Sequence, residues 1–200
     1  NGNASVRVYD ALDLPFSFTI GRTGSKINYP TFVQFGLSPT YKWAKMHLGY
    51  RNMTFSPYTL VGHTFLGVGA ELNPGKFRFA MMYGRLRDAK EVDLNVSFVE
   101  PAFKRIGYGA KVGFGTLKSF IDLIVFRGKD DKNSLKNTQD LYITPSENMV
   151  VGLSSQLTLF QDVIMYLEVA GSAFTRNQNS VDVLIDSLNN DIENYVPPGI

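Results

Sequence analysis

Residues 105–114 read Arg-Ile-Gly-Tyr-Gly-Ala-Lys-Val-Gly-Phe, and this stretch decides the fold class. Every second residue is apolar, and the residues between them are glycine or basic. This period of two predicts a β-strand whose two faces meet different surroundings. An aromatic, oily face opposite a face of glycine and basic side chains is typical of a transmembrane β-barrel, which has lipid outside and a crowded polar lumen inside.

The same alternation recurs along the chain and predicts about ten strands, at residues 4–9, 14–20, 31–38, 43–51, 62–72, 76–84, 105–114, 119–128, 149–159 and 163–175. Short connections alternate with long ones; the long ones cover residues 22–30, 53–61, 86–101, 129–148 and 176 onward. This rhythm is that of an antiparallel up-and-down barrel. We therefore predict an all-β chain in which residues 1–200 form a single transmembrane β-barrel domain or a segment of one.

The hairpin rhythm places both ends of the chain on the side of the long connections. Complete bacterial barrels normally begin and end on the other side. The first predicted strand is also short and carries Arg7 between valines, which suits an edge strand or a partial strand. No charged and apolar leader opens the chain, so we expect either that one was removed or that this is a piece of a longer chain. We expect the first and last strands to pair with further strands of the same chain and not with each other.

A soluble barrel is the alternative, because alternation alone does not say which face is inside. Three features favour the membrane: strands longer than is usual in soluble sheets, glycines in phase with the polar residues, and aromatic residues near strand ends. Lys45, Arg78 and Lys111 are also in phase with those glycines. A Lys or Arg facing lipid at mid-bilayer would cost about 2–4 kcal/mol, so the glycine face is predicted to line the lumen.

Composition excludes several classes of function. The formal net charge is only +2, so no strongly basic surface suggests nucleic acid as a partner. The chain has no cysteine, which removes disulfides, thiolate metal sites and cysteine nucleophiles. The sequence contains no run of about 18 apolar residues, so it predicts no transmembrane helix. This result does not exclude transmembrane β-strands, because apolar and polar residues alternate in them.

The few reactive residues predict no enzyme, cofactor or metal site. His47 and His63 are the only histidines and lack the spacing of a metal site. A catalytic pair of Ser56 with His63 is conceivable but lacks a predicted third partner. The pair Asp130-Asp131 falls in a predicted loop without the spacing of a calcium-binding loop.

Three further stretches carry a resemblance to a known group of proteins. Residues 38–44 read Ser-Pro-Thr-Tyr-Lys-Trp-Ala, residues 47–51 read His-Leu-Gly-Tyr-Arg, and residues 63–79 run from His-Thr-Phe-Leu-Gly to Lys-Phe-Arg-Phe. They resemble outer-membrane β-barrel proteins of Bacteroidota, a largely uncharacterised family, and the resemblance extends through residues 106–114 and 147–159. It implies a barrel in the bacterial outer membrane, and it implies no activity and no catalytic residue.

Candidate functional residues are the polar side chains in phase with the glycines: Lys45, His47, Arg51, Glu71, Lys76, Arg78, Arg105, Lys111 and Glu168. Basic residues predominate among them, and two interpretations stay open. The charges pair across neighbouring strands and brace the wall, or they form a lining that favours anions.

As a function we expect a porin-like barrel, or one associated with transport or secretion, with a basic lumen lined by glycine. The alternative is a structural scaffold in an outer-membrane complex that binds other outer-membrane proteins through its long loops. In either case the expected partner is the lipid bilayer, with no nucleic acid.

Overall fold

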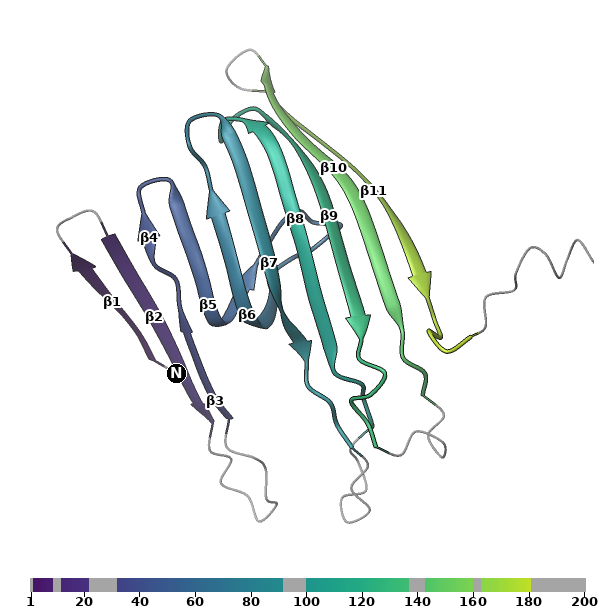
Figure 1. Cartoon of the computed structure of the whole chain (residues 1–200). Coiled ribbons are helices and arrows are strands. Elements are labelled where there is room, and N and C mark those ends of the chain that lie inside the picture. The colour runs from purple at the N-terminus through teal and green to yellow at the C-terminus, as the bar shows by residue number, and fades with distance from the viewer. Residues whose placement is uncertain are drawn as a thin grey trace, which may run out of the picture.

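The computed structural model of the chain describes residues 2–8, 12–21, 32–91, 100–136, 143–159 and 163–180. These residues form one antiparallel sheet (Figure 1), which confirms the predicted all-β class. No helix within them is long and apolar enough to cross a membrane. The strands are β1 (Gly2–Val8), β2 (Leu12–Gly21), β3 (Phe32–Leu37), β4 (Thr40–Tyr41), β5 (Ala44–Met53), β6 (His63–Leu72), β7 (Phe77–Arg87), β8 (Arg105–Gly115), β9 (Phe120–Asp130), β10 (Glu147–Leu159) and β11 (Val163–Thr175).

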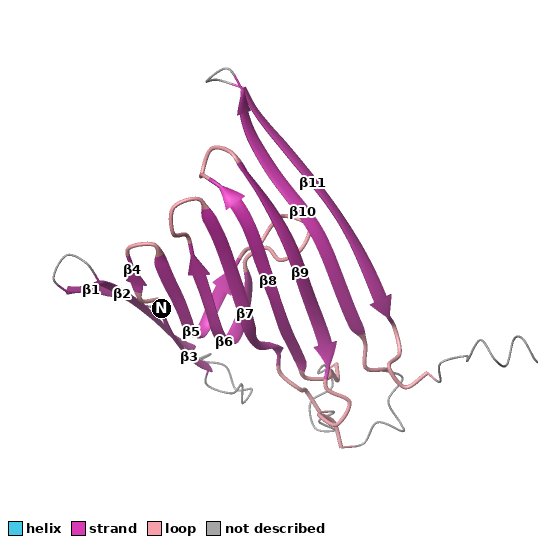
Figure 2. Ribbon diagram, turned by 45° about the horizontal axis from the view of Figure 1, so that its top comes forward, coloured by secondary structure: helices cyan, strands magenta, loops and turns pink. Residues whose placement is uncertain are grey.

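Each strand pairs with its neighbours in chain order, so the predicted hairpin topology is confirmed. Short turns lie at one end of the sheet and most long connections at the other (Figures 1 and 2). In the described part of the chain β1 and β11 form the two edges and do not pair with each other, as expected. The described sheet is therefore open.

The structure has eleven strands where about ten were predicted, because the two-residue β4 lies in the predicted connection after the strand at residues 31–38. β3 and β4 both lie between β2 and β5, and Ser38 and Pro39 separate them. Proline has no amide hydrogen to donate to a ladder, so pairing is interrupted there. The Ser38 amide still donates to the Pro15 carbonyl at 2.9 Å, which keeps the two pieces aligned.

The outer face of the sheet is apolar and exposed. One row of directly opposed residues crosses it, in which each pairs with the next on the neighbouring strand: Leu72, Phe79, Val112, Leu123, Leu153 and Val169. Leu123, Leu153 and Val169 are exposed, as are Tyr83, Phe114 and Met165 on the same face. A contiguous exposed apolar surface that extends across several strands marks a face that contacts a membrane or another protein.

The opposite, inner face carries a row of glycines. Gly36, Gly49, Gly67, Gly84, Gly107 and Gly128 oppose one another in turn across β3 and β5–β9. A Cβ atom added to Gly67 would collide with the backbone of β7, and one added to Gly107 would lie 2.6 Å from the Leu86 side chain. At these two positions neighbouring groups approach the backbone so closely that only glycine fits without a shift of its surroundings.

The connection between β5 and β6 folds across the inner face (Figure 1). We call residues 54–62 the 54–62 segment. Phe55 and Leu60 of this segment are buried, and the Phe55 amide donates to the Leu60 carbonyl at 2.8 Å. They join an apolar cluster on the inner face that includes Met53, Phe65, Ala80, Met82, Ile124 and Phe126. Phe55 follows the end of β5 but is only 5% exposed, so it packs on the inner face and is not one of the exposed aromatic residues near strand ends.

Candidate functional site

A buried ion cluster lies on the inner face of β7, β8 and β9. The Arg78 guanidinium donates to both carboxylate oxygens of Asp122, at 2.8 and 2.9 Å, and the Lys111 ammonium lies 4.0 Å from the same carboxylate. Asp122 is 1% exposed. Its burial is tolerated because two cations and the bidentate geometry compensate the charge.

The reach of Arg78 across β8 depends on the glycine between the two residues. In the ladder Arg78 opposes Gly113, and Gly113 opposes Asp122. A Cβ atom on Gly113 would occupy the space of the Asp122 carboxylate. The side chains of β7 and β9 therefore meet over a strand that has no side chain at that point.

A second polar group joins β5 and β6 to the residue that follows β3. His47 Nε2 lies 2.7 Å from the Glu71 carboxylate, and His47 Nδ1 lies 3.1 Å from the Ser38 hydroxyl. A carboxylate only accepts, so Nε2 donates to Glu71. The Lys45 ammonium adds a contact of 3.6 Å to the same carboxylate.

Serine, histidine and glutamate in this order are also the residue types of a hydrolytic triad. Here Ser38 and His47 are both buried, at 5% and 4% exposed, so a substrate has no open route to the hydroxyl. The arrangement thus links strands and presents no accessible nucleophile.

A third cluster lies where β8 and β9 approach the long connections. The Arg105 guanidinium donates to both oxygens of Asp130, at 2.7 and 2.9 Å, and Arg87 lies 3.4 Å from the same carboxylate. The Ser146 amide and hydroxyl each donate to Asp130 at 3.0 Å. Sequence analysis assigned Asp130 to a solvated loop, which is wrong: it is the last residue of β9 and is buried.

Three predicted lining residues have other surroundings. Arg51 lies on the inner face of β5 and donates to the Ser17 hydroxyl and to the Pro15 and Gly36 carbonyls. Lys76 was expected within a strand, but it lies exposed in the turn before β7. Glu168 lies on β11, where its Oε1 accepts the Tyr58 amide at 2.9 Å and its Oε2 accepts the Tyr166 hydroxyl at 2.5 Å.

The structure thus gathers six of the nine predicted residues into three separate clusters and does not form one site. Lys45 and His47 meet at Glu71, Arg78 and Lys111 share Asp122, and Arg105 shares Asp130 with Arg87. These contacts are the pairing across strands that the first interpretation of the charges expects. Ser38 was missed because only its position after β3 brings it to His47.

Neither the conceivable catalytic pair nor a metal site is assembled. The Ser56 hydroxyl bonds that of Thr59 at 2.7 Å, whereas the His63 ring contacts the Thr64 carbonyl at 2.9 Å. In the described ranges there is no group of three or more acidic, histidine or cysteine side chains able to hold a metal ion.

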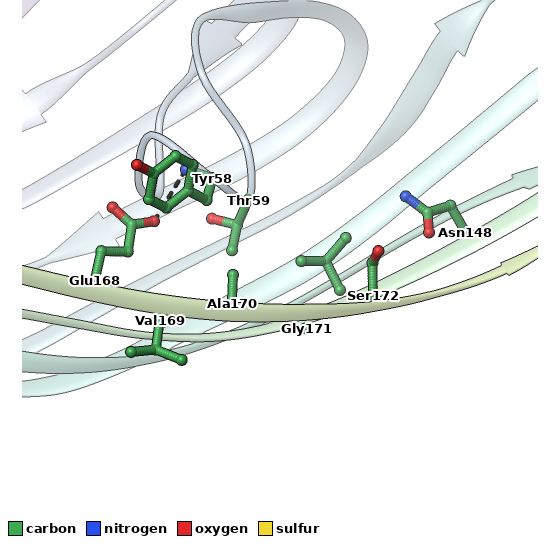
Figure 3. A pocket seen from close by; sticks show the side chains of 9 residues that line it. Tyr58, Thr59, Asn148, Glu168, Val169, Ala170, Gly171 and Ser172 are labelled. Carbon is green, nitrogen blue, oxygen red and sulfur yellow. Dashed lines mark hydrogen bonds between the residues drawn. The ribbon is translucent and has the colours of Figure 1, made fainter.

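An open pocket of about 610 Å³ lies between the tip of the 54–62 segment and the inner face of β10 and β11 (Figure 3). Glu168, Ala170 and Ser172 point from β11 toward the segment, whereas Val169 points to the opposite side. Tyr58 and Thr59 of the segment and Asn148 of β10 complete the polar lining. This pocket is lined mainly by uncharged groups, unlike the three clusters.

Comparisons of the chain with protein families, with curated proteins and with solved structures gave no match.

Proposed function

We propose that the chain forms part of the wall of a β-barrel in a bacterial outer membrane, and that this barrel acts in transport across the membrane. The observation that carries the proposal is the row of opposed apolar residues across the outer face, of which Leu123, Leu153 and Val169 are exposed. A sheet with an exposed apolar face on one side and ion pairs on the other fits lipid outside and a polar lumen inside. The resemblance of residues 38–44 and 63–79 to Bacteroidota barrel proteins supports the same location.

The two edges bear on the size of the barrel. Lipid does not hydrogen-bond to backbone groups, so a strand edge in a bilayer requires a partner. β11 has thirteen residues and β1 has seven, so they are poorly matched in length to close on each other. We propose that further strands of the same chain pair with both edges and complete a larger barrel.

Membrane insertion is tested by fractionation of the full-length protein. We expect it in the outer-membrane fraction, extracted only by detergent, with a mobility on gels that changes on heating. Recovery from the soluble periplasm without detergent would contradict the proposal.

Transport is tested by recordings of the purified full-length protein in planar bilayers. Conductance steps are the expected result. The 54–62 segment favours a second candidate, a structural scaffold, because it and the apolar cluster fill part of the inner face. Absence of conductance together with stable, stoichiometric partner proteins in a pull-down would support the scaffold.

A further inference from the structure

The inner face is divided into two parts of different chemistry. From β5 to β9 it carries the ion clusters, and the base of the 54–62 segment packs on it through Phe55 and Leu60. Along the inner positions of β10 and β11 that the structure describes, the one charged side chain is Glu168. The open pocket lies over this second part.

Most cations of the first part contact carboxylates of the wall. Arg78 and Lys111 share Asp122, and Arg105 binds Asp130. Lys111 also donates to the Phe55 carbonyl, at 3.5 Å, beneath the 54–62 segment. None of these cations lines the open pocket.

The tip of the 54–62 segment sets the width of the pocket. The Glu168 carboxylate binds the Tyr58 amide, and a Cβ atom added to Gly152 of β10 would lie 2.9 Å from the Thr59 methyl group. Gly62, with φ of 54°, ends the segment, and its amide donates to the Thr54 hydroxyl at 2.9 Å, which closes the neck of the loop. The tip is thus fixed at both ends, beside a wall that leaves room for a solute.

The groups that face this space are suited to hydroxyl groups. Ser172 and Thr59 carry hydroxyls, and Asn148 also lies in the lining. The Tyr58 side chain, 69% exposed, offers an aromatic surface to the C–H face of a ring. A few polar groups beside an aromatic surface fix the orientation of a small ligand, and the lone carboxylate of Glu168 repels anions.

We propose that the passage runs through the open pocket over the inner face of β10 and β11, beside the contacts that the Tyr58–Thr59 tip makes with these strands, and that it admits neutral polyhydroxylated solutes in preference to anions. This inference rests on the transport function proposed above, and it differs from the lining that favours anions, which was one of the two interpretations left open by the sequence. Its basis is the placement of the cations away from the pocket and of Glu168 beside it.

The test compares glucose with gluconate, which share a carbon skeleton and differ in charge. Liposomes containing the full-length protein are assayed for entry of each solute, and faster entry of glucose is expected. Ser172→Lys and Glu168→Gln, the second of which keeps an acceptor for the Tyr58 amide, should both raise gluconate entry relative to glucose. Lys118→Gln removes an exposed positive charge in the turn between β8 and β9, outside the lining of the pocket, and serves as the control, with an unchanged ratio.

Two results would overturn the inference while transport stands. One is faster entry of gluconate than of glucose in the unmodified protein. The other is a gluconate-to-glucose ratio that neither variant changes although both migrate as folded protein on unheated gels. Exclusion of both solutes together with absence of conductance would overturn transport itself, and this inference with it.

Discussion

Arg78 on β7 and Asp122 on β9 are bound to each other across the full width of β8, with Arg78 Nε 2.8 Å from Asp122 Oδ1. The strand between them contributes Gly113 at the crossing point. Two charges two strands apart are thus joined directly because the intervening residue has no side chain. This link ties three strands together on the inner face.

Replacing Asp122 with alanine should destabilise the protein strongly. The change leaves Arg78 and Lys111 without their shared carboxylate, and removal of one partner from a buried ion pair costs about 3–5 kcal/mol. Asp88→Ala is the control, since the Asp88 side chain is exposed and its pair with Arg85 is worth at most about 1 kcal/mol. Urea unfolding in detergent micelles measures both. Equal effects of the two changes would show that the Asp122 cluster is no stronger than a surface pair.

Gly113→Ala should break the same link without removing a charge. The new methyl group would occupy the position of the Asp122 carboxylate, and overpacking of this kind costs about 1–3 kcal/mol. Gly128→Ala is the matched control, because a Cβ atom there has no neighbour closer than 3.9 Å. The midpoint temperature of the gel-mobility change measures both variants, and a loss at Gly128 as large as that at Gly113 would contradict the explanation.

Gly109→Val should detach the 54–62 segment from the inner face. A Cβ atom at Gly109 would lie 3.0 Å from the Phe55 ring and 2.7 Å from the Val125 carbonyl. We expect faster cleavage of the segment by an added protease in the variant. Gly171→Val, where a Cβ atom meets nothing within 4 Å, should leave the cleavage rate unchanged. Protection of the segment from cleavage in the Gly109 variant would show that the packing of Phe55 on the inner face does not depend on the space at Gly109.

Leu123→Arg distinguishes a lipid-facing surface from a water-facing one. Leu123 lies in the middle of the outer row and is 55% exposed. Against lipid at mid-bilayer an arginine costs about 2–4 kcal/mol, whereas on a soluble protein an exposed arginine is tolerated. We expect a marked loss of folded protein in liposome refolding assays. Leu117→Arg, in a turn and 88% exposed, should refold as the unmodified protein does.

The strands themselves were predictable because their signal is local. The alternation in residues 105–114 gives β8 with its two faces, and Val163–Thr175 has the bounds that its alternation predicted. Alternation predicted neither the short strand β4 nor, before it, the interruption of pairing at Ser38 and Pro39. The interruption depends on a missing amide hydrogen and not on the apolar pattern.

The candidate site was less predictable because its contacts are made across strands. Arg78 and Lys111 share a face with the glycines, as the sequence predicted, yet which carboxylate each cation binds follows only from the register of three strands. By its spacing Phe126 falls on the same face as Asp122, and the sequence alone gives no reason for an apolar ring on the polar face. The 54–62 segment supplies that reason, since its buried Phe55 gives the inner face an apolar cluster.

The glycine row from Gly36 to Gly128 also has a consequence for assembly. Glycines at matching heights allow adjacent strands to bend together at one level. The strands are bowed even though the two edges of the sheet are apart (Figure 1). These strands are therefore curved although the barrel is not closed. The sheet can thus adopt its curvature first, and pairing of its two edges can follow as the last step of assembly.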